Sequence, residues 1–241
     1  MNYYKKYIDG NKRKVWHEFF SLNGDIDEEY ATLILEYFIS GFKENIRIID
    51  FFLKNSNYAF VNADDGCSIE ENKITYLFSQ PNDSSIIENV KLHTQNHGHL
   101  PLLFTEIYRH IDYVDFEGFF PDWKKENYFN PLIDPLVLLP SRYLLDIWEM
   151  NNKPNYLGFG PDALAKDNTS GSGLLYGVFF SNVKTIDTKI ANYHNEDVFF
   201  SDYIRNCFEW GGFAGLEFEK IPENDDIFLL IKKIKKEMIE I

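Results

Sequence analysis

The chain has 241 residues, of which 44% are hydrophobic, 17% aromatic and 26% charged, a composition that excludes an intrinsically disordered protein. Its 38 acidic and 24 basic residues give a formal net charge of −14. A field of this sign repels nucleic acid and anionic membrane surfaces and attracts basic partners, so we expect neither nucleic acid nor membrane among its partners.

The N-terminal part is predicted to be helical. A short helix is expected over 10–22. Asp25 and Glu28 then resemble a capping box, and apolar residues recur at helical spacing as far as Leu53, over about seven turns. Gly41 interrupts this long helix, at a cost of about 1 kcal/mol against alanine, and we interpret it as a site of close packing.

Beyond residue 57, short extended segments alternate with helices at irregular intervals. Extended segments are predicted at 58–61, 74–78, 113–116, 135–139, 156–159 and 174–180. Helices are predicted at 83–97, 101–111, 141–150, 201–210 and 224–241. The irregular intervals argue against a regular βαβ array. We therefore predict an α+β fold with N-terminal helices, one of them long, and a central, mostly antiparallel or mixed sheet of short strands flanked by helices.

We expect one domain over residues 1–241. Its parts would be a helical N-terminal part at 1–57, a mixed α+β core at 58–221 and a C-terminal helix at 222–241. There is no apolar run of 18 residues and no secretory signal pattern at the start. Cys67 and Cys207 form no spaced pair, which suits reduced thiols. These features favour a cytoplasmic protein.

Two histidines stand at a spacing that can hold zinc. On a helix, His93 and His97 share one face. Thr94, however, occupies the position of the glutamate in a zincin motif, and Gly98 is expected to end the helix before a third histidine. We interpret both histidines as surface or capping residues near a helix C-terminus, and predict no metal.

No catalytic or cofactor motif is complete. Gly158-Phe159-Gly160 lacks the third glycine of a dinucleotide fingerprint, and Ser170-Gly171-Ser172-Gly173 lacks the lysine of a phosphate-binding loop, so both are interpreted as turns. Neighbouring carboxylates such as Asp115 and Glu117 do not make an acid–base pair by adjacency alone, because the required separation is spatial. We predict no catalytic residue and no cofactor.

The C-terminal helix is amphipathic. Its apolar face carries Ile227, Ile231 and Ile234, and lysines stand opposite. Such a helix can lie on a membrane, but packing on the domain is the interpretation we favour, because amphipathic surface helices are the norm.

The run Phe208-Glu209-Trp210-Gly211-Gly212-Phe213-Ala214-Gly215-Leu216 combines an aromatic helix end with a double-glycine stop. The glycines let the chain reverse at positive φ, so that Phe213 and Leu216 fold back onto the core. This run resembles the closing segment of a group of uncharacterised bacterial proteins with the pattern Trp-Gly-Gly-Phe-Pro-Gly-Leu, although Ala214 replaces the proline.

Residues 100–108 are in turn similar to a helix opening of the SUKH superfamily, although Asp112-Tyr113 stands where a glycine-rich turn is common there. This resemblance implies an α+β fold, no catalytic residue and, for many members, an immunity protein that binds and neutralises a bacterial toxin.

Acidic charge is concentrated in one part of the chain. Residues 1–60 carry eight bases and nine acids, whereas residues 61–220 carry 12 bases and 24 acids and so hold −12 of the −14. The expected function is a non-enzymatic acidic protein that binds a basic partner, such as a toxin domain, through Asp64, Asp65, Glu70 and Glu71. Three alternatives stay open: charge that serves solubility alone, a metal-dependent hydrolase using His93 and His97, and an adaptor or regulatory protein.

Overall fold

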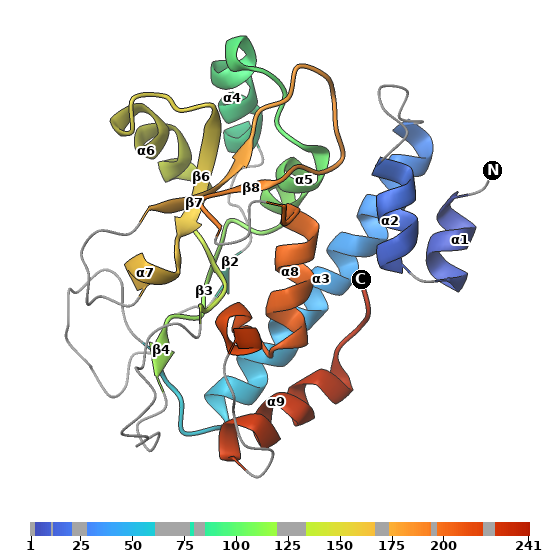
Figure 1. Cartoon of the computed structure of the whole chain (residues 1–241), viewed down its shortest axis with the longest axis vertical. Helices are drawn as coiled ribbons and strands as arrows, with labels where there is room; N and C mark the ends of the chain where they lie inside the picture. Colours follow the sequence, from blue (N-terminus) through green and yellow to red (C-terminus); the bar gives the residue numbers. More distant parts are fainter. Residues whose placement is uncertain are drawn as a thin grey trace.

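The computed structural model describes residues 3–10, 12–20, 28–60, 78–79, 85–119, 134–166, 174–193, 197–218 and 225–241. The α+β class is confirmed: a layer of helices that includes one long N-terminal helix lies beside small antiparallel sheets of short strands (Figure 1). The N-terminal helices are α1 (Tyr3–Asp9), α2 (Lys12–Phe20) and α3 (Glu28–Lys54). Helix α1 was not predicted from the sequence.

Helix α3 is the predicted long helix, and it runs past α8 and α9 through the middle of the molecule (Figure 1). Its buried side chains include Phe38, Phe42, Ile46, Ile49 and Leu53, all 0% exposed. They stand three or four positions apart and therefore form one apolar face. Burying each such side chain is worth roughly 1.5–3 kcal/mol, so this face contributes strongly to the stability of the core.

The described strands form three small antiparallel sheets. Strand β1 (Ala59–Phe60) pairs with β4 (Gly118–Phe119). Strands β2 (Phe78–Ser79), β3 (Tyr113–Asp115) and β5 (Val137–Leu138) form the second sheet in that order. Strands β6 (Tyr156–Pro161), β7 (Leu175–Phe179) and β8 (Ile190–Ala191) form the third. Strands β4 and β8 were not predicted.

The remaining helices lie between and after these strands. They are α4 (Ser85–Thr94), η2 (Gln95–His97), α5 (Leu102–His110), η3 (Ser141–Tyr143), α6 (Leu144–Met150), α7 (Ala163–Lys166), α8 (Phe200–Glu209), η4 (Ala214–Phe218) and α9 (Asp226–Glu237), where η marks a 3-10 helix. Helix α7 was not predicted. Among the residues described, no helix is both long and apolar enough to cross a membrane.

The Gly158-Phe159-Gly160 run lies in strand β6, so its interpretation as a turn was wrong. Phe159 is fully buried there, and a Cβ atom on Gly160 would clash with the carbonyl oxygen of Val137. Gly160 therefore serves the close approach of β6 to β5, whereas a Cβ atom on Gly158 would meet the Leu175 side chain on β7. Residues 170–173 lie outside the described part of the chain.

The predicted helix over 224–241 ends early, at Glu237. The side chain of Asn45 on α3 makes two hydrogen bonds to the backbone of Ile239, in the segment that follows α9. Its Nδ2 donates to the Ile239 carbonyl and its Oδ1 accepts from the Ile239 N–H, both at 2.8 Å. The chain is thereby held extended, and Ile241 packs against Gly41, where a Cβ atom would clash with it. The predicted close packing at Gly41 is confirmed. We call residues 238–241 the C-terminal tail.

The predicted chain reversal after α8 is also confirmed. Gly211 and Gly212 have φ values of +66° and +104°, and Phe213 and Leu216 are each 1% exposed. The returning chain binds the segment before β5, because the Ala214 amide donates to the carbonyl of Asp134 at 3.0 Å. A proline at 214, the residue of the resembled group, has no amide hydrogen and could not make this bond.

We expect Gly211→Ala to lower the free energy of unfolding by about 1–2 kcal/mol, because left-handed backbone disfavours residues with a Cβ atom. Gly211→Asn is the matched control: it adds a larger side chain, but asparagine tolerates this conformation, so its cost is smaller. Urea unfolding of the three proteins measures the difference. An Asn variant that is as unstable as the Ala variant would show that packing against α9, and not backbone conformation, requires the glycine.

Candidate functional site

The predicted partner-binding residues, Asp64, Asp65, Glu70 and Glu71, lie outside the described residues. The described chain that leads towards them ends at Phe60, which pairs with Gly118 beside Glu117.

The two histidines of the hydrolase alternative are held by ordinary packing. His93 on α4 is exposed, and its Nδ1 lies 2.9 Å from the Asn89 carbonyl oxygen one turn earlier. The ring of His97 meets the ring of Trp148 edge-on, with 4.8 Å between the centroids. Over the described ranges, no group of three histidine, cysteine or carboxylate side chains is arranged to hold a metal ion.

A buried polar cluster that includes an ion pair surrounds Asp134. Nζ of Lys166 on α7 lies 2.6 Å from Asp134 Oδ1, and the two side chains are 1% and 0% exposed. The hydroxyl of Tyr176 on β7 donates to Asp134 Oδ2 at 3.2 Å, and Lys166 also reaches the hydroxyl of Tyr203 on α8 at 3.5 Å. We call these four residues the Asp134 cluster.

Local structure brings the members of the Asp134 cluster together. Asp134 precedes Pro135 and has a φ of +45°, a strained conformation for a residue with a side chain. Helix α7 begins after Asp162, whose carboxylate accepts from the Ala165 amide at 2.8 Å and from the Leu174 amide at 2.9 Å. These bonds tie α7 to the start of β7, so that Lys166 and Tyr176 converge on the same carboxylate.

Neighbouring groups in the interior are kept in their neutral forms. Burial, followed by the charge of Asp134, raises the pKa of the Tyr176 phenol, the Tyr203 phenol and the Cys207 thiol above their ordinary values. A thiol is a poor nucleophile unless it ionises, and an uncharged phenol can only exchange hydrogen bonds. The arrangement therefore suits support of the fold better than nucleophilic catalysis.

Two carboxylates beside the cluster bind protons unusually tightly. Burial, followed by the charge of Asp115, raises the pKa of Glu117 to about 7, against the opposing charge of Lys166. Burial also raises the pKa of Asp115, although its Oδ1 accepts from the Glu117 amide at 2.9 Å. Asp115 and Glu117, which are close in the sequence, therefore also lie together in space, at the turn between β3 and β4.

Sequence reasoning missed the Asp134 cluster. A usable signal was present, since Asp134 is the only charged residue in the apolar stretch 131–139. A lone carboxylate in such a stretch requires a buried partner. Nothing in the sequence identified Lys166 as that partner, because it follows 32 positions later.

Most of the described basic side chains of residues 61–220 form ion pairs with carboxylates of the same region. Such ion pairs involve Lys91, Arg109, Lys153, Lys166, Lys189 and Arg205. In the described part of this region, the exposed carboxylates of Asp146 and Glu217 make no ion pair, so acid charge is left uncovered at these two positions.

The stability of the protein should depend on pH through Glu117. Its pKa of about 7 in the folded state lies above the ordinary 4.5, so the folded protein binds more protons than the unfolded chain between these pH values. The free energy of unfolding should fall by about 1–3 kcal/mol as the pH rises from 4.5 through 7.

Urea unfolding at pH 5, 6, 7 and 8 measures this dependence. The free energy of unfolding of Glu117→Gln should change less with pH than that of the wild type. Asp146→Asn, at an exposed carboxylate, should keep the wild-type slope, and equal slopes in all three proteins would contradict this assignment.

The histidines can be tested by stability and zinc together. We expect His97→Ala to lower the free energy of unfolding by about 0.5–1 kcal/mol through the lost aromatic contact, and His93→Ala to have a smaller effect. Equimolar zinc should leave the melting temperature of the wild type unchanged. A rise in melting temperature with zinc that both substitutions abolish would instead restore the hydrolase alternative.

Comparison of the chain with family models, with curated proteins and with solved structures gives no match.

Proposed function

We propose that the chain is a cytoplasmic, non-enzymatic protein that binds a basic protein partner. An immunity protein that neutralises a basic bacterial toxin is the specific form that we favour, on the resemblance of its closing segment and of residues 100–108. The observation that carries the proposal is the charge distribution, in which residues 61–220 hold −12 of the net −14.

The charge sum of the acidic region supports this proposal. At a distance the field depends on the net charge, and residues 61–220 carry 12 more acids than bases. Complementary fields raise the rate of association by about one to three orders of magnitude at low salt.

The Asp134 cluster gives the enzyme alternative less support. Its ion pair is closed to solvent, and its phenols and thiol are held neutral. A catalytic group must reach a substrate, and these groups are in contact with one another instead.

The first test removes the predicted contact charges together. A variant with Asp64→Asn, Asp65→Asn, Glu70→Gln and Glu71→Gln should associate with the partner about tenfold or more slowly at low salt. The matched control neutralises four carboxylates elsewhere: Asp9→Asn, Glu36→Gln, Asp226→Asn and Glu237→Gln. Both variants change the net charge by the same amount, so a difference between their association rates reports a local binding surface.

The partner is obtained by capture from the native host at low salt and identified by mass spectrometry. We expect a basic protein encoded beside this gene that stops growth when expressed alone, and we expect co-expression of this chain to restore growth. The proposal is wrong if the captured proteins are not basic, or if both four-fold variants bind the partner at the wild-type rate. Capture of a basic protein that is not toxic would instead favour the adaptor alternative.

A further inference from the structure

Strands β1 and β4 form a short contact at the turn that follows β3. The pairing joins residues 59–60 to residues 118–119. Within the described chain, neither strand pairs with any other. A two-stranded pairing of this length is marginally stable by itself, so the contacts around it decide whether it forms. We call the pairing and the turn before it, residues 58–60 and 115–119, the β1–β4 contact.

Tyr58 holds the β1–β4 contact together. Its hydroxyl donates to the Phe116 carbonyl at 2.6 Å, and its side chain is buried. Its ring lies against Gly118, where an added Cβ atom would come within 2.6 Å of the ring. Both interactions require the backbone of 116–118 to lie close to Tyr58, so a displacement of Glu117, the residue between them, weakens both.

Two carboxylates meet at the turn of the β1–β4 contact. Oδ1 of Asp115 accepts a hydrogen bond from the Glu117 amide at 2.9 Å, which closes the turn. Both side chains are partly buried, and neither makes an ion pair with a described residue. Two neighbouring carboxylates resist simultaneous ionisation, because each negative charge raises the energy of the other. The closed turn therefore favours a form in which one of them carries a proton.

Besides Asp115, two charged or titratable groups of the described chain face Glu117. Burial, followed by the charges of Asp115 and Glu117, raises the pKa of the Tyr58 phenol, so this group stays neutral. The positive charge of Lys166 on α7 favours ionised Glu117, but its Nζ lies 2.6 Å from Asp134 and makes its ion pair there. Ionised Glu117 therefore has no base in contact with it among the described residues.

The Glu117 carboxylate binds a proton more tightly when the turn is closed. There, burial, followed by the charge of Asp115, raises the pKa of Glu117 from 4.5 to about 7. In an opened turn the carboxylate reaches water, and its pKa returns towards the ordinary value. The closed form thus binds more protons than the open form between these two pH values, so opening becomes more favourable as the pH rises from 4.5 through 7.

We propose that the β1–β4 contact is a pH-sensitive latch, closed while Glu117 carries a proton and opened locally when Glu117 ionises beside Asp115. Opening breaks the two-residue pairing and the hydroxyl bond of Tyr58, whereas the apolar face of α3 and the sheet of β6, β7 and β8 stay in place. Strand β1 leads in the sequence to Asp64 and Asp65, so the latch also links pH to the segment proposed to bind the partner. This consequence rests on the proposed function, whereas the latch itself is tested without a partner.

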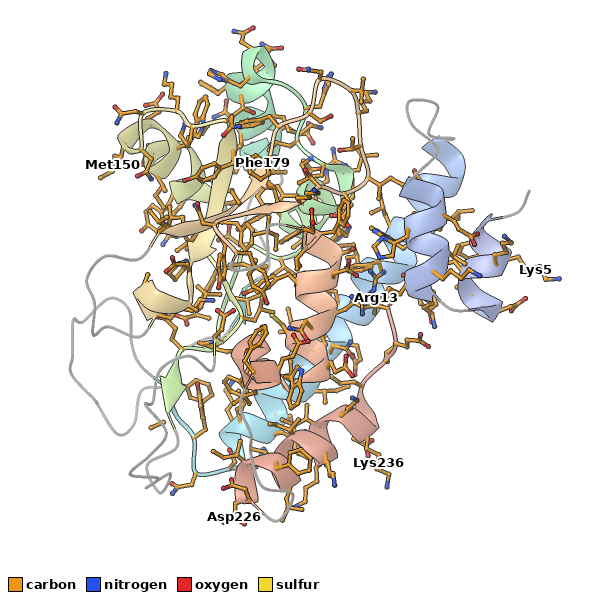
Figure 2. The ribbon with its side chains drawn as sticks, in the orientation of Figure 1. Lys5, Arg13, Met150, Phe179, Asp226 and Lys236 are labelled. Carbon is orange, nitrogen blue, oxygen red and sulfur yellow. The ribbon has the colours of Figure 1, made fainter. Side chains whose placement is uncertain are left out.

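The test follows contacts within the full-length protein by NMR at pH 5 and pH 8. A nuclear Overhauser effect between the Tyr58 ring and the Cα hydrogens of Gly118 reports the closed latch, and we expect its intensity to fall about twofold or more at pH 8. The effect between Leu157 on β6 and Val178 on β7, which are register partners, is the internal reference and should not change. Figure 2 shows Phe179, the last residue of β7, in the upper part of the molecule, whereas β4 lies in its lower part (Figure 1).

Three variants identify the group responsible. Glu117→Gln mimics the protonated side chain and should keep the closed-latch signal at both pH values. Asp115→Asn keeps an oxygen that can accept from the turn amide but removes the neighbouring charge, so it should lose less of the signal at pH 8 than the wild type does. Asp146→Asn, which removes one charge on the distant α6, is the matched control and should behave like the wild type.

The proposal is overturned if the wild type keeps the signal between Tyr58 and Gly118 at pH 8, or if Glu117→Gln loses it as the wild type does. Loss of the β6–β7 reference signal together with it would show global unfolding in place of local opening, and would overturn the proposal as well. Equal circular dichroism of the wild type and Glu117→Gln at pH 5 checks that the substitution leaves the fold intact.

Discussion

The buried carboxylate of Asp134 is the constraint on which the arrangement of the core depends. Its side chain holds Lys166 and Tyr176, and its carbonyl oxygen accepts from Ala214 after the chain reversal. The amide of Leu136, two residues after Asp134, donates to the Gly212 carbonyl at 2.8 Å. An isolated buried charge is strongly unfavourable, so α7, β7, the segment before β5 and the reversal after α8 must be placed together. The strained backbone at Asp134 is tolerated because these contacts fix it from several sides.

Helix α3 is the second element that organises the core, and the absence of a side chain at its Gly41 has a structural role. The missing side chain at Gly41 makes room for Ile241, and Asn45 one turn later binds the backbone of Ile239. The tail is thereby kept out of helix α9 and lies beside Arg205, whose Nε donates to the Ile241 main-chain oxygen at 2.8 Å.

Charge acts on two scales in this protein. At short range, bases of the acidic region are paired with nearby carboxylates, and the ion pair of Asp134 with Lys166 is closed to solvent. At long range the field is set by the net charge, and residues 61–220 hold −12 of the −14. Near Arg13, two guanidinium groups lie beside the single carboxylate of Asp202.

The sequence by itself determined the α+β class, the long helix, the close packing at Gly41 and the reversal at Gly211, because periodicity and glycine conformation act over a few residues. It placed most extended segments within a few residues of their strands. Only the tertiary structure decided which strands pair, where the last helix ends and which side chains surround Asp134. Asn45 and Ile239 are 194 positions apart, and Asp134 and Lys166 are 32 apart. Such contacts depend on the path of the whole chain, which no local pattern encodes.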